Sequence, residues 1–152
     1  MREEVVEREI TRVETKTVYI AEDGTQFDSK WKCQKYEEEV RFENAQAAIE
    51  KYHIEDLDNK TPISDSGDTC DTYEYLWYRV PDAAAEAEIS NCYKEAMSNI
   101  KIKEYPEVIA IEDPGVDAEY AFTLSDMKEL TESFFNELGI KVTFQGSVIC
   151  HP

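Results

Sequence analysis

The chain has 152 residues, and its 34 Asp and Glu outnumber its 16 Lys and Arg, which gives a formal net charge of −18 at pH 7. This charge argues against direct nucleic-acid binding, because a protein that binds the phosphate backbone needs Lys and Arg to displace its counterions. Hydrophobic residues make up 41% of the chain, which argues against disorder and favours one compact, acidic domain over residues 1–152.

A hairpin is expected at the start of a hairpin-helix unit that covers about residues 5–52. Val5–Ala21 is rich in the β-branched and aromatic residues that strands prefer. This segment ends at Asp23-Gly24, a pair that favours the tight turn of a hairpin. The returning strand is expected to be short and to cover Thr25–Phe27.

A helix is expected after this hairpin, because Asp28 or Ser29 offers an N-cap. Apolar residues recur at helical spacing beyond that cap. A break near Asn44 would divide the segment. The sequence therefore allows either one long helix or two shorter ones before His53.

An acidic loop is expected over about residues 55–71, because Asp58–Asp71 is rich in Asp, Ser, Thr, Pro and Gly. Thr72–Val80 follows the loop and is the clearest strand of the chain. Its aromatic residues fall on both faces, which predicts a strand in the centre of a sheet. This strand opens a β-α-β-α-β part over about residues 72–146.

Helices and strands alternate in the rest of that part. Pro81-Asp82 opens a helix that extends to about Ile100. A strand over Glu107–Glu112 ends at the turn formed by Asp113-Pro114-Gly115. A last strand is expected over Ile140–Phe144.

The helix before that last strand is expected to be capped at both ends. Ser125 is its predicted N-cap and Gly139 its C′ residue. The apolar residues predicted to face inward are Met127, Leu130, Phe134, Phe135 and Leu138. The order of elements predicts an α+β fold, in which a mostly antiparallel sheet has three or four helices packed on one side.

Catalytic and cofactor motifs are scarce in this chain. The two histidines, His53 and His151, stand in no catalytic motif, and His53 is expected to cap the C-terminus of a helix. The four cysteines form no C-x-x-C pair, which argues against a disulfide framework and against structural zinc. The chain has 5 glycines and no phosphate-binding loop. We therefore expect no enzymatic activity, no cofactor and no bound metal.

Two segments of the chain concentrate its carboxylates. Glu55–Glu74 carries seven of them against Lys60 alone, and Glu104–Glu119 carries six with no basic residue. A surface of this kind attracts a cationic partner. The acidic residues expected to bind a partner are Glu55, Asp56, Asp58, Asp65, Asp68, Asp71, Glu74, Glu104, Glu107, Glu112, Asp113, Asp117 and Glu119.

Four aromatic residues, Tyr73, Tyr75, Trp77 and Tyr78, stand close together beside the first acidic segment. Packing in the core is the simpler interpretation of these rings. If some of them were exposed beside carboxylates, they would serve as aromatic anchors for an Arg-rich or Lys-rich protein. The sequence leaves both interpretations open.

Two parts of the chain resemble a group of known sequences. The first is Thr17–Ser29, with the run Thr-Val-Tyr-Ile-Ala-Glu-Asp-Gly-Thr-Gln-Phe-Asp-Ser, followed by Cys33 and Tyr36-Glu37. The second is Tyr75–Asp82, with the run Tyr-Leu-Trp-Tyr-Arg-Val-Pro-Asp. Both are similar to small, uncharacterised acidic proteins from phages and prophages of Gram-positive bacteria.

The resemblance covers roughly residues 12–40 and 72–95, and its motifs have low functional specificity. Members of the group share no agreed catalytic residues, so none is carried over to this chain. The resemblance implies a setting. Small accessory phage proteins often act on host machinery, and they include anti-CRISPR and other anti-defence inhibitors, some of which are acidic mimics of DNA.

The leading hypothesis is a phage-encoded binding protein that inhibits a host defence or nucleic-acid-handling protein by placing carboxylates where that protein holds phosphates. Duplex DNA presents about one charge per 1.7 Å of axis, so a mimic needs acids at comparable density on one face. No apolar run approaches the roughly 20 residues that span a bilayer, and Met1–Glu4 is unlike a signal peptide. The expected partner is therefore a basic host protein in the bacterial cytoplasm, with no membrane contact. The oligomeric state is left open.

Two alternatives belong to other functional classes. Sequestration of a small signalling nucleotide would need basic and aromatic pocket residues, for which Arg79, Lys101 and Lys103 with Trp77 or Tyr78 are the candidates. A structural or assembly protein of the phage particle would need acidity only to remain in solution.

Overall fold

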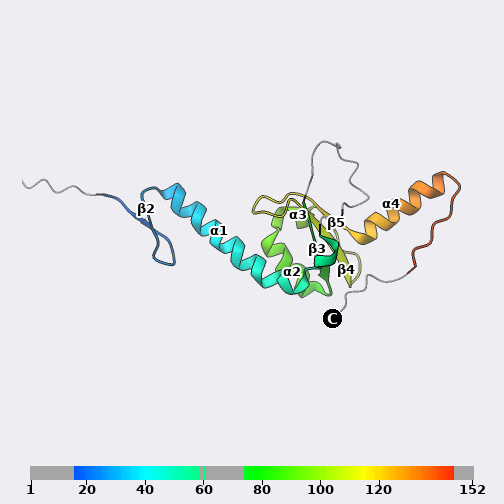
Figure 1. Cartoon of the computed structure of the whole chain (residues 1–152), viewed down its shortest axis with the longest axis horizontal. Coiled ribbons are helices and arrows are strands. Elements are labelled where there is room, and N and C mark those ends of the chain that lie inside the picture. The colour runs from blue at the N-terminus through cyan, green and yellow to red at the C-terminus, as the bar shows by residue number, and fades with distance from the viewer. Residues whose placement is uncertain (1–15, 59, 61–73, 146–152) are drawn as a thin grey trace, which may run out of the picture. The chain divides into compact units, whose positions relative to one another are not determined.

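The computed structural model describes residues 16–58, 60 and 74–145. The chain divides into two compact units, one that ends at Glu38 and one that begins at Glu39. Helix α1 (Lys30–Ile49) contributes residues to both units (Figure 1). The single domain expected over the whole chain stays a prediction.

The N-terminal unit contains the hairpin predicted at Asp23-Gly24. Strands β1 (Tyr19–Ile20) and β2 (Gln26–Phe27) pair antiparallel. Gly24 turns the chain with a φ of +90°, a conformation that glycine adopts without a steric penalty. The Asp23 carboxylate then accepts hydrogen bonds from the Thr25 amide at 2.9 Å and from the Tyr36 hydroxyl at 2.7 Å. These two bonds attach the turn to α1.

Helix α1 is the long helix of the two arrangements that the sequence allowed. The Ser29 hydroxyl accepts a hydrogen bond from the Lys32 amide at 3.2 Å and is therefore the N-cap. The helix continues without a break past Asn44. Two short 3₁₀-helices, η1 (Glu50–Tyr52) and η2 (Glu55–Leu57), follow it.

The second unit is built on a three-stranded antiparallel sheet of β3 (Tyr75–Val80), β4 (Glu107–Glu112) and β5 (Ala121–Thr123). The strand order is β3-β4-β5. Tyr78 pairs with Ile109, which in turn pairs with Thr123. The α+β class and the antiparallel sheet predicted from the sequence are confirmed.

The prediction that the aromatic strand β3 is central is wrong, because the central strand is β4. All residues of β4 from Glu107 to Ile111 are buried, as expected for a strand with neighbours on both edges and packing on both faces. The outer edge of β3 has an isolated bridge between His53 and Tyr78, and a hydrogen bond from the Ile54 amide to the Trp77 carbonyl at 2.8 Å.

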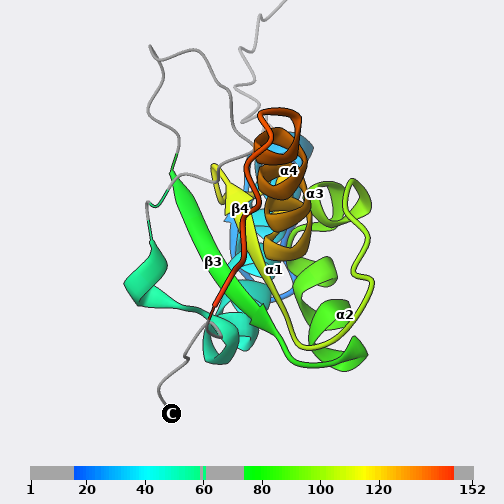
Figure 2. The same ribbon diagram turned by 90° about the vertical axis from the view of Figure 1, so that its right-hand side faces the viewer.

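The helices lie on both faces of this sheet and not on one, which corrects a second expectation. Figure 2 shows α2 (Ala83–Cys92) and α3 (Lys94–Ser98) on one side of β3 and β4. Met127, from the last helix, is buried against the other side. The core residues of the first side are Ile49, Tyr78, Val80, Ala85, Ile89, Cys92, Tyr93, Ala96, Met97, Ile109, Ile111, Ala118 and Ala121. Those of the second are Tyr75, Trp77, Val108, Ala110 and Met127.

The single helix predicted between Pro81 and Ile100 is broken at Tyr93. Helix α2 begins after Pro81-Asp82, as the sequence indicated, and the Asp82 carboxylate caps it by accepting a hydrogen bond from the Ala85 amide at 2.9 Å. Tyr93 leaves helical geometry and is buried, with its hydroxyl 3.1 Å from the Tyr78 hydroxyl. Burial raises the pKa of both phenols. Inward packing of Tyr93 therefore accompanies the break between α2 and α3.

Helix α4 (Leu124–Glu137) begins two residues earlier than predicted. The Thr123 hydroxyl, not that of Ser125, accepts the capping hydrogen bond, which the Asp126 amide donates at 3.0 Å. At the other end Gly139 has a φ of +73°, and the Ile140 amide donates to the Phe135 carbonyl at 2.9 Å. This is the Schellman pattern, so the predicted C′ glycine is confirmed.

The strand expected over Ile140–Phe144 does not form, although these residues are described. Both edges of β4 are already taken by β3 and β5. The sequence reasoning missed β5, since three residues are too few to produce a clear alternating pattern. Among the helices of the described ranges, none has both the length and the apolar composition required to cross a membrane.

Candidate protein-binding surface

The two acidic segments of the sequence meet at one end of the sheet. β3 begins and β4 ends there, with Tyr75 opposite Glu112. The Asp113 amide donates to the Glu74 carbonyl at 2.8 Å, and the Glu112 amide donates to the Tyr120 carbonyl at 3.1 Å. We call this end, with the carboxylates of Glu74, Glu112, Asp113, Asp117 and Glu119, the acidic end of the sheet.

Most of these carboxylates have no cation beside them. Glu74, Asp113, Asp117 and Glu119 are exposed, and within the described residues no Lys, Arg or His side chain lies at ion-pair distance from them. Ion pairs occur elsewhere, for example between Lys51 and Glu88 at 2.7 Å. At Glu74, Asp113, Asp117 and Glu119 the acidic end therefore presents negative charge to solvent that no cation of the described residues pairs with.

The other acidic residues expected at the surface are dispersed. Glu55 and Asp56 are exposed on η2, along the outer edge of β3, and Glu104 is exposed in the segment before β4. Glu107 lies in the core at 5% exposure, where its carboxylate accepts a hydrogen bond from the Val108 amide at 2.9 Å. Asp65, Asp68, Asp71 and the aromatic Tyr73 lie outside the described residues.

Asp58 forms an ion pair with His53 instead of standing free. The Nε2 atom of His53 is 2.8 Å from a carboxylate oxygen of Asp58, and its Nδ1 atom is 3.4 Å from one of Glu50. Burial of the ring opposes the charged form, but the hydrogen bonds to Asp58 and Glu50 outweigh it and raise the pKa of His53. His53 thus holds η1 and the end of η2 against β3.

The remaining aromatic candidates are core side chains. Tyr75 and Trp77 pack on one face of the sheet and Tyr78 on the other, and none is more than 6% exposed. The Trp77 indole donates a hydrogen bond to the Lys60 carbonyl at 3.1 Å. Of the two interpretations of these rings, their burial favours core packing.

Exposed apolar side chains occur instead on α4, where the sequence predicted inward packing. Met127 is buried, but Leu130, Phe134 and Leu138 are 54%, 59% and 59% exposed. The helix rises about 1.5 Å per residue, so Phe134 lies about 10 Å beyond Met127 along the axis. The apolar residues therefore follow the predicted helical spacing, but of these four only Met127, near the start of α4, packs against the sheet.

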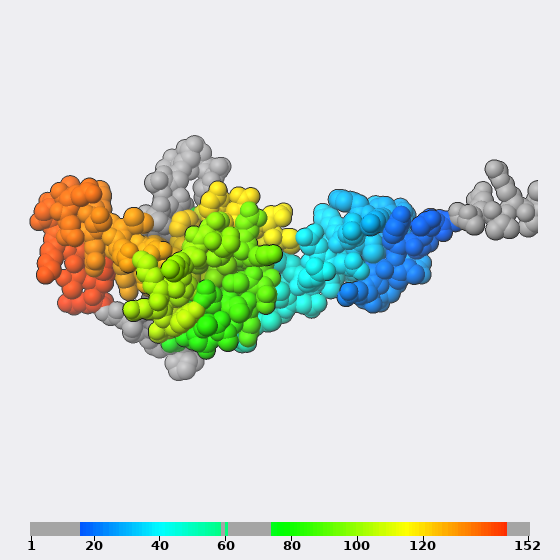
Figure 3. Space-filling view, turned by 180° about the vertical axis from the view of Figure 1, so that it is seen from behind, coloured from blue at the N-terminus to red at the C-terminus, as the bar shows by residue number. Residues whose placement is uncertain are grey.

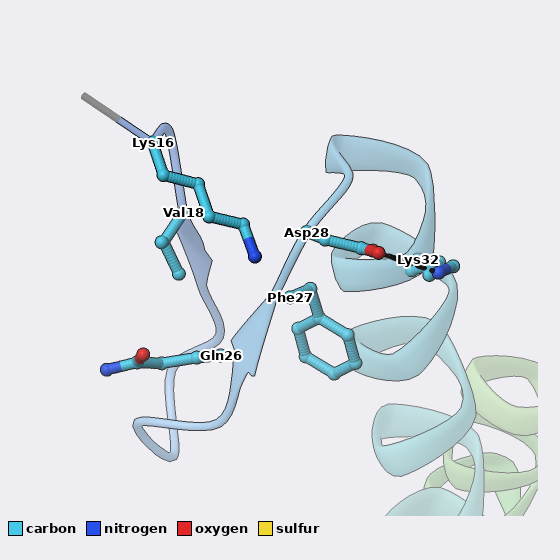
Figure 4. A pocket seen from close by; sticks show the side chains of 6 residues that line it. All are labelled: Lys16, Val18, Gln26, Phe27, Asp28 and Lys32. Carbon is cyan, nitrogen blue, oxygen red and sulfur yellow. Dashed lines mark hydrogen bonds and ion pairs between the residues drawn. The ribbon is translucent and has the colours of Figure 1, made fainter. Parts of the chain in front are cut away.

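A shallow groove of about 460 Å³ lies beside the N-terminal hairpin (Figure 4). Its lining includes Lys16, Phe27 and Lys32. The Nζ atom of Lys32 is 2.9 Å from the Asp28 carboxylate, and this contact lowers the pKa of Asp28. Lys16 is thus the one lysine of the groove that Asp28 does not bind directly, which is little positive charge for a phosphate ligand.

The residues named for nucleotide sequestration do not assemble into a pocket. Trp77 and Tyr78 are buried on opposite faces of the sheet. Lys103 is held by Asp126 at 3.2 Å and by Glu129 at 2.8 Å. Arg79 and Lys101 are exposed. The described arrangement therefore offers no aromatic face beside a free cation at these positions.

Reactive and metal-binding groups are few in the described residues. Within them, no group of three or more His, Cys, Asp or Glu is placed to hold a metal ion. Cys33 and Cys92 are buried free thiols. Burial raises the pKa of Cys92 to about 11, which disfavours the thiolate that a nucleophile requires.

Comparisons of the chain with protein-family models, with curated proteins and with solved structures found no match.

Proposed function

We propose that this chain is an acidic binding protein that occupies the cation-lined groove of a nucleic-acid-handling protein. In this proposal it is a phage product, and its target is a basic protein of the host's defence. The observation that carries the proposal is the acidic end of the sheet, where Glu74 and Asp113 bring together two acidic segments that are far apart in the sequence.

Electrostatics supplies the physical reason. A groove that binds nucleic acid is lined with Lys and Arg, which attract any dense array of negative groups. A net charge of −18 steers the whole chain towards such a groove. The exposed carboxylates of Glu74, Asp113, Asp117 and Glu119 would then take the place of phosphates. Binding of this kind weakens with salt, since the charges involved are exposed before contact.

The experiment uses the tagged full-length chain to capture proteins from a nuclease-treated lysate of a Gram-positive host that carries defence systems. Bound proteins are eluted with a short DNA duplex, with RNA, or with salt, and are identified by mass spectrometry. We expect a basic nucleic-acid-binding protein that is released by both nucleic acid and salt. Its activity on nucleic acid should fall when the chain is added.

The variant that tests the acidic end is Glu74→Gln, Asp117→Asn and Glu119→Gln combined. A matched control, Glu22→Gln, Glu38→Gln and Glu43→Gln combined, removes the same charge from exposed positions outside the sheet. We expect the first variant to lose the captured protein at a lower salt concentration than the control. Equal retention of the two variants, or a captured protein that DNA and RNA do not displace, would refute phosphate mimicry by this surface.

A further inference from the structure

The exposed apolar side chains of the second unit are concentrated at its C-terminal helix. Of the eleven large hydrophobic residues that are exposed among those described, five lie between residues 130 and 144. They are Leu130, Phe134, Leu138, Ile140 and Phe144. Single exposed apolar residues need no explanation, but a contiguous group marks an interaction site.

Leu130, Phe134 and Leu138 follow one another at intervals of four residues, so they lie along one side of α4. We call these three residues the α4 stripe. Figure 3 shows this half of the helix, in orange, standing out from the strands and from α2. The chain turns back at Gly139, and Ile140 and Phe144 follow at 50% and 41% exposure. Two more exposed apolar side chains therefore follow the stripe in the sequence.

We propose that the α4 stripe is the docking site for a basic amphipathic helix of the partner protein. This inference rests on the proposed function, because it takes the partner to be basic. An amphipathic helix that docks on an apolar surface presents apolar anchors at intervals of three and four residues. The inference adds an apolar anchor to a surface that would otherwise bind by charge alone.

Charge on α4 selects a basic occupant. Glu137, three residues after Phe134 and next to Leu138, borders the stripe, and no basic side chain of the described residues lies at ion-pair distance from it. Glu137 is the last residue of α4 and lies at the negative end of the helix dipole. The last turn of the helix contains no basic residue to offset this negative charge. Lys128 and Lys141 are the nearby cations in sequence. A partner with Lys or Arg beside its apolar face would neutralise this end of α4.

Other occupants fit this charge less well. A second copy of the chain would bring another net charge of −18 and the same acidic helix end against the first. An anionic membrane would repel the same carboxylates. The more N-terminal acids of α4 are already partly neutralised, since Lys103 contacts both Asp126 and Glu129. The C-terminal half of α4 therefore carries the exposed apolar side chains, whereas the acidic residues that pair with Lys103 lie in its N-terminal half.

The test measures the binding of two labelled synthetic peptides to the full-length chain by fluorescence anisotropy. The first peptide is about four helical turns long, with Leu at i, i+4 and i+7 spacing and Lys on the remaining positions. The second has the same composition, shuffled so that its leucines share no face. The variant is Leu130→Gln, Phe134→Gln and Leu138→Gln combined. The control, Ile20→Gln and Trp31→Gln combined, removes apolar side chains that are 62% and 66% exposed.

We expect the wild-type chain to bind the amphipathic peptide more tightly than the shuffled one. The α4 variant should lose about tenfold or more in affinity for the amphipathic peptide and little for the shuffled one. The control variant should bind both peptides as the wild type does. Circular dichroism should show that all three chains are folded, since the replaced side chains are exposed.

Three results would overturn the inference. The first is equal affinity of the wild type for the two peptides, and the second is an α4 variant that binds the amphipathic peptide as the wild type does. Either result would leave the proposed function intact, because docking by charge does not require the α4 stripe. The proposed function is tested separately, by displacement with nucleic acid and by the variant of Glu74, Asp117 and Glu119. The third is a wild-type chain that sediments as a dimer while the α4 variant sediments as a monomer, because the stripe would then bind a second copy of the chain.

Discussion

Glu74 and Asp113 are joined by two hydrogen bonds across the ends of β3 and β4. The Asp113 amide donates to the Glu74 carbonyl at 2.8 Å, and the Glu74 amide donates to an Asp113 carboxylate oxygen at 3.2 Å. Two residues 39 positions apart are therefore neighbours, and each brings an acidic segment with it. These hydrogen bonds hold the two acidic residues side by side. Within the described residues, neither carboxylate forms an ion pair that would offset its charge.

Removing charge from the acidic end should stabilise the protein. Combined replacement of Glu74 and Glu119 by Gln and Asp117 by Asn relieves repulsion between neighbouring carboxylates, and we expect the melting temperature to rise by about 1–4 °C at low salt. The gain should shrink at 1 M NaCl, where the Debye length falls to about 3 Å. Calorimetry at the two salt concentrations measures both effects. A lower melting temperature at low salt would show that these carboxylates stabilise the fold.

Thr123 and Ser125 offer a direct test of the start of α4. Thr123→Val keeps the shape of a buried side chain but removes the hydroxyl that accepts from the Asp126 amide, so we expect a loss of about 1 kcal/mol in the free energy of unfolding. Ser125→Ala should change it by less than about 0.5 kcal/mol. Urea denaturation of both variants decides between the two caps. A larger loss in the Ser125 variant would place the cap where the sequence alone predicted it.

Ile109 and Leu130 are apolar residues with opposite roles. Ile109 is fully buried on the central strand, so Ile109→Ala should cost about 2–5 kcal/mol through lost burial and a residual cavity. Leu130 is 54% exposed, and Leu130→Ala should cost less than about 0.5 kcal/mol. Chemical denaturation of the two variants provides the comparison. Similar large losses would mean that the α4 stripe is packed inside the folded protein.

His53 should make stability depend on pH near neutrality. Its pKa is raised in the folded chain, so the folded state binds the proton more tightly than the unfolded state. The stabilisation is complete below the ordinary histidine pKa and is lost as the pH rises through the raised value. Urea unfolding at pH 6 and pH 8 should therefore show a decrease in the wild type that is reduced in His53→Gln. An equal decrease in both chains would assign the pH dependence to other groups.

Local signals in the sequence predicted much of the fold. The Asp23-Gly24 turn, the start of α2 after Pro81-Asp82 and the Gly139 end of α4 are all formed as expected. Each depends on hydrogen bonds between residues a few positions apart, which the identities of those residues largely determine. The bounds of β4 were also correct, because a continuous apolar run between turn residues is a strong strand signal.

The sequence predicted less of the candidate surface than of the fold. The acidic segments were found from composition, but Glu107 is buried within one of them because it begins the central strand. The α4 stripe was identified by its spacing and assigned to the core, since periodicity shows which side of a helix is apolar and not what covers it. Exposure of Phe134 could not be read from α4 alone.

The sequence by itself determined the acidity of the chain, its α+β class and most of its turns and caps, because these depend on composition and on residues close together in the chain. Only the tertiary structure decided that β4 is central, that Glu74 meets Asp113 and that α4 extends past the sheet. These features depend on which strand edges pair and on how far the sheet extends beneath a helix. Strand pairing and the extent of the sheet are both determined by contacts between segments that are distant in the sequence. A pattern within one segment does not show the strength of those contacts.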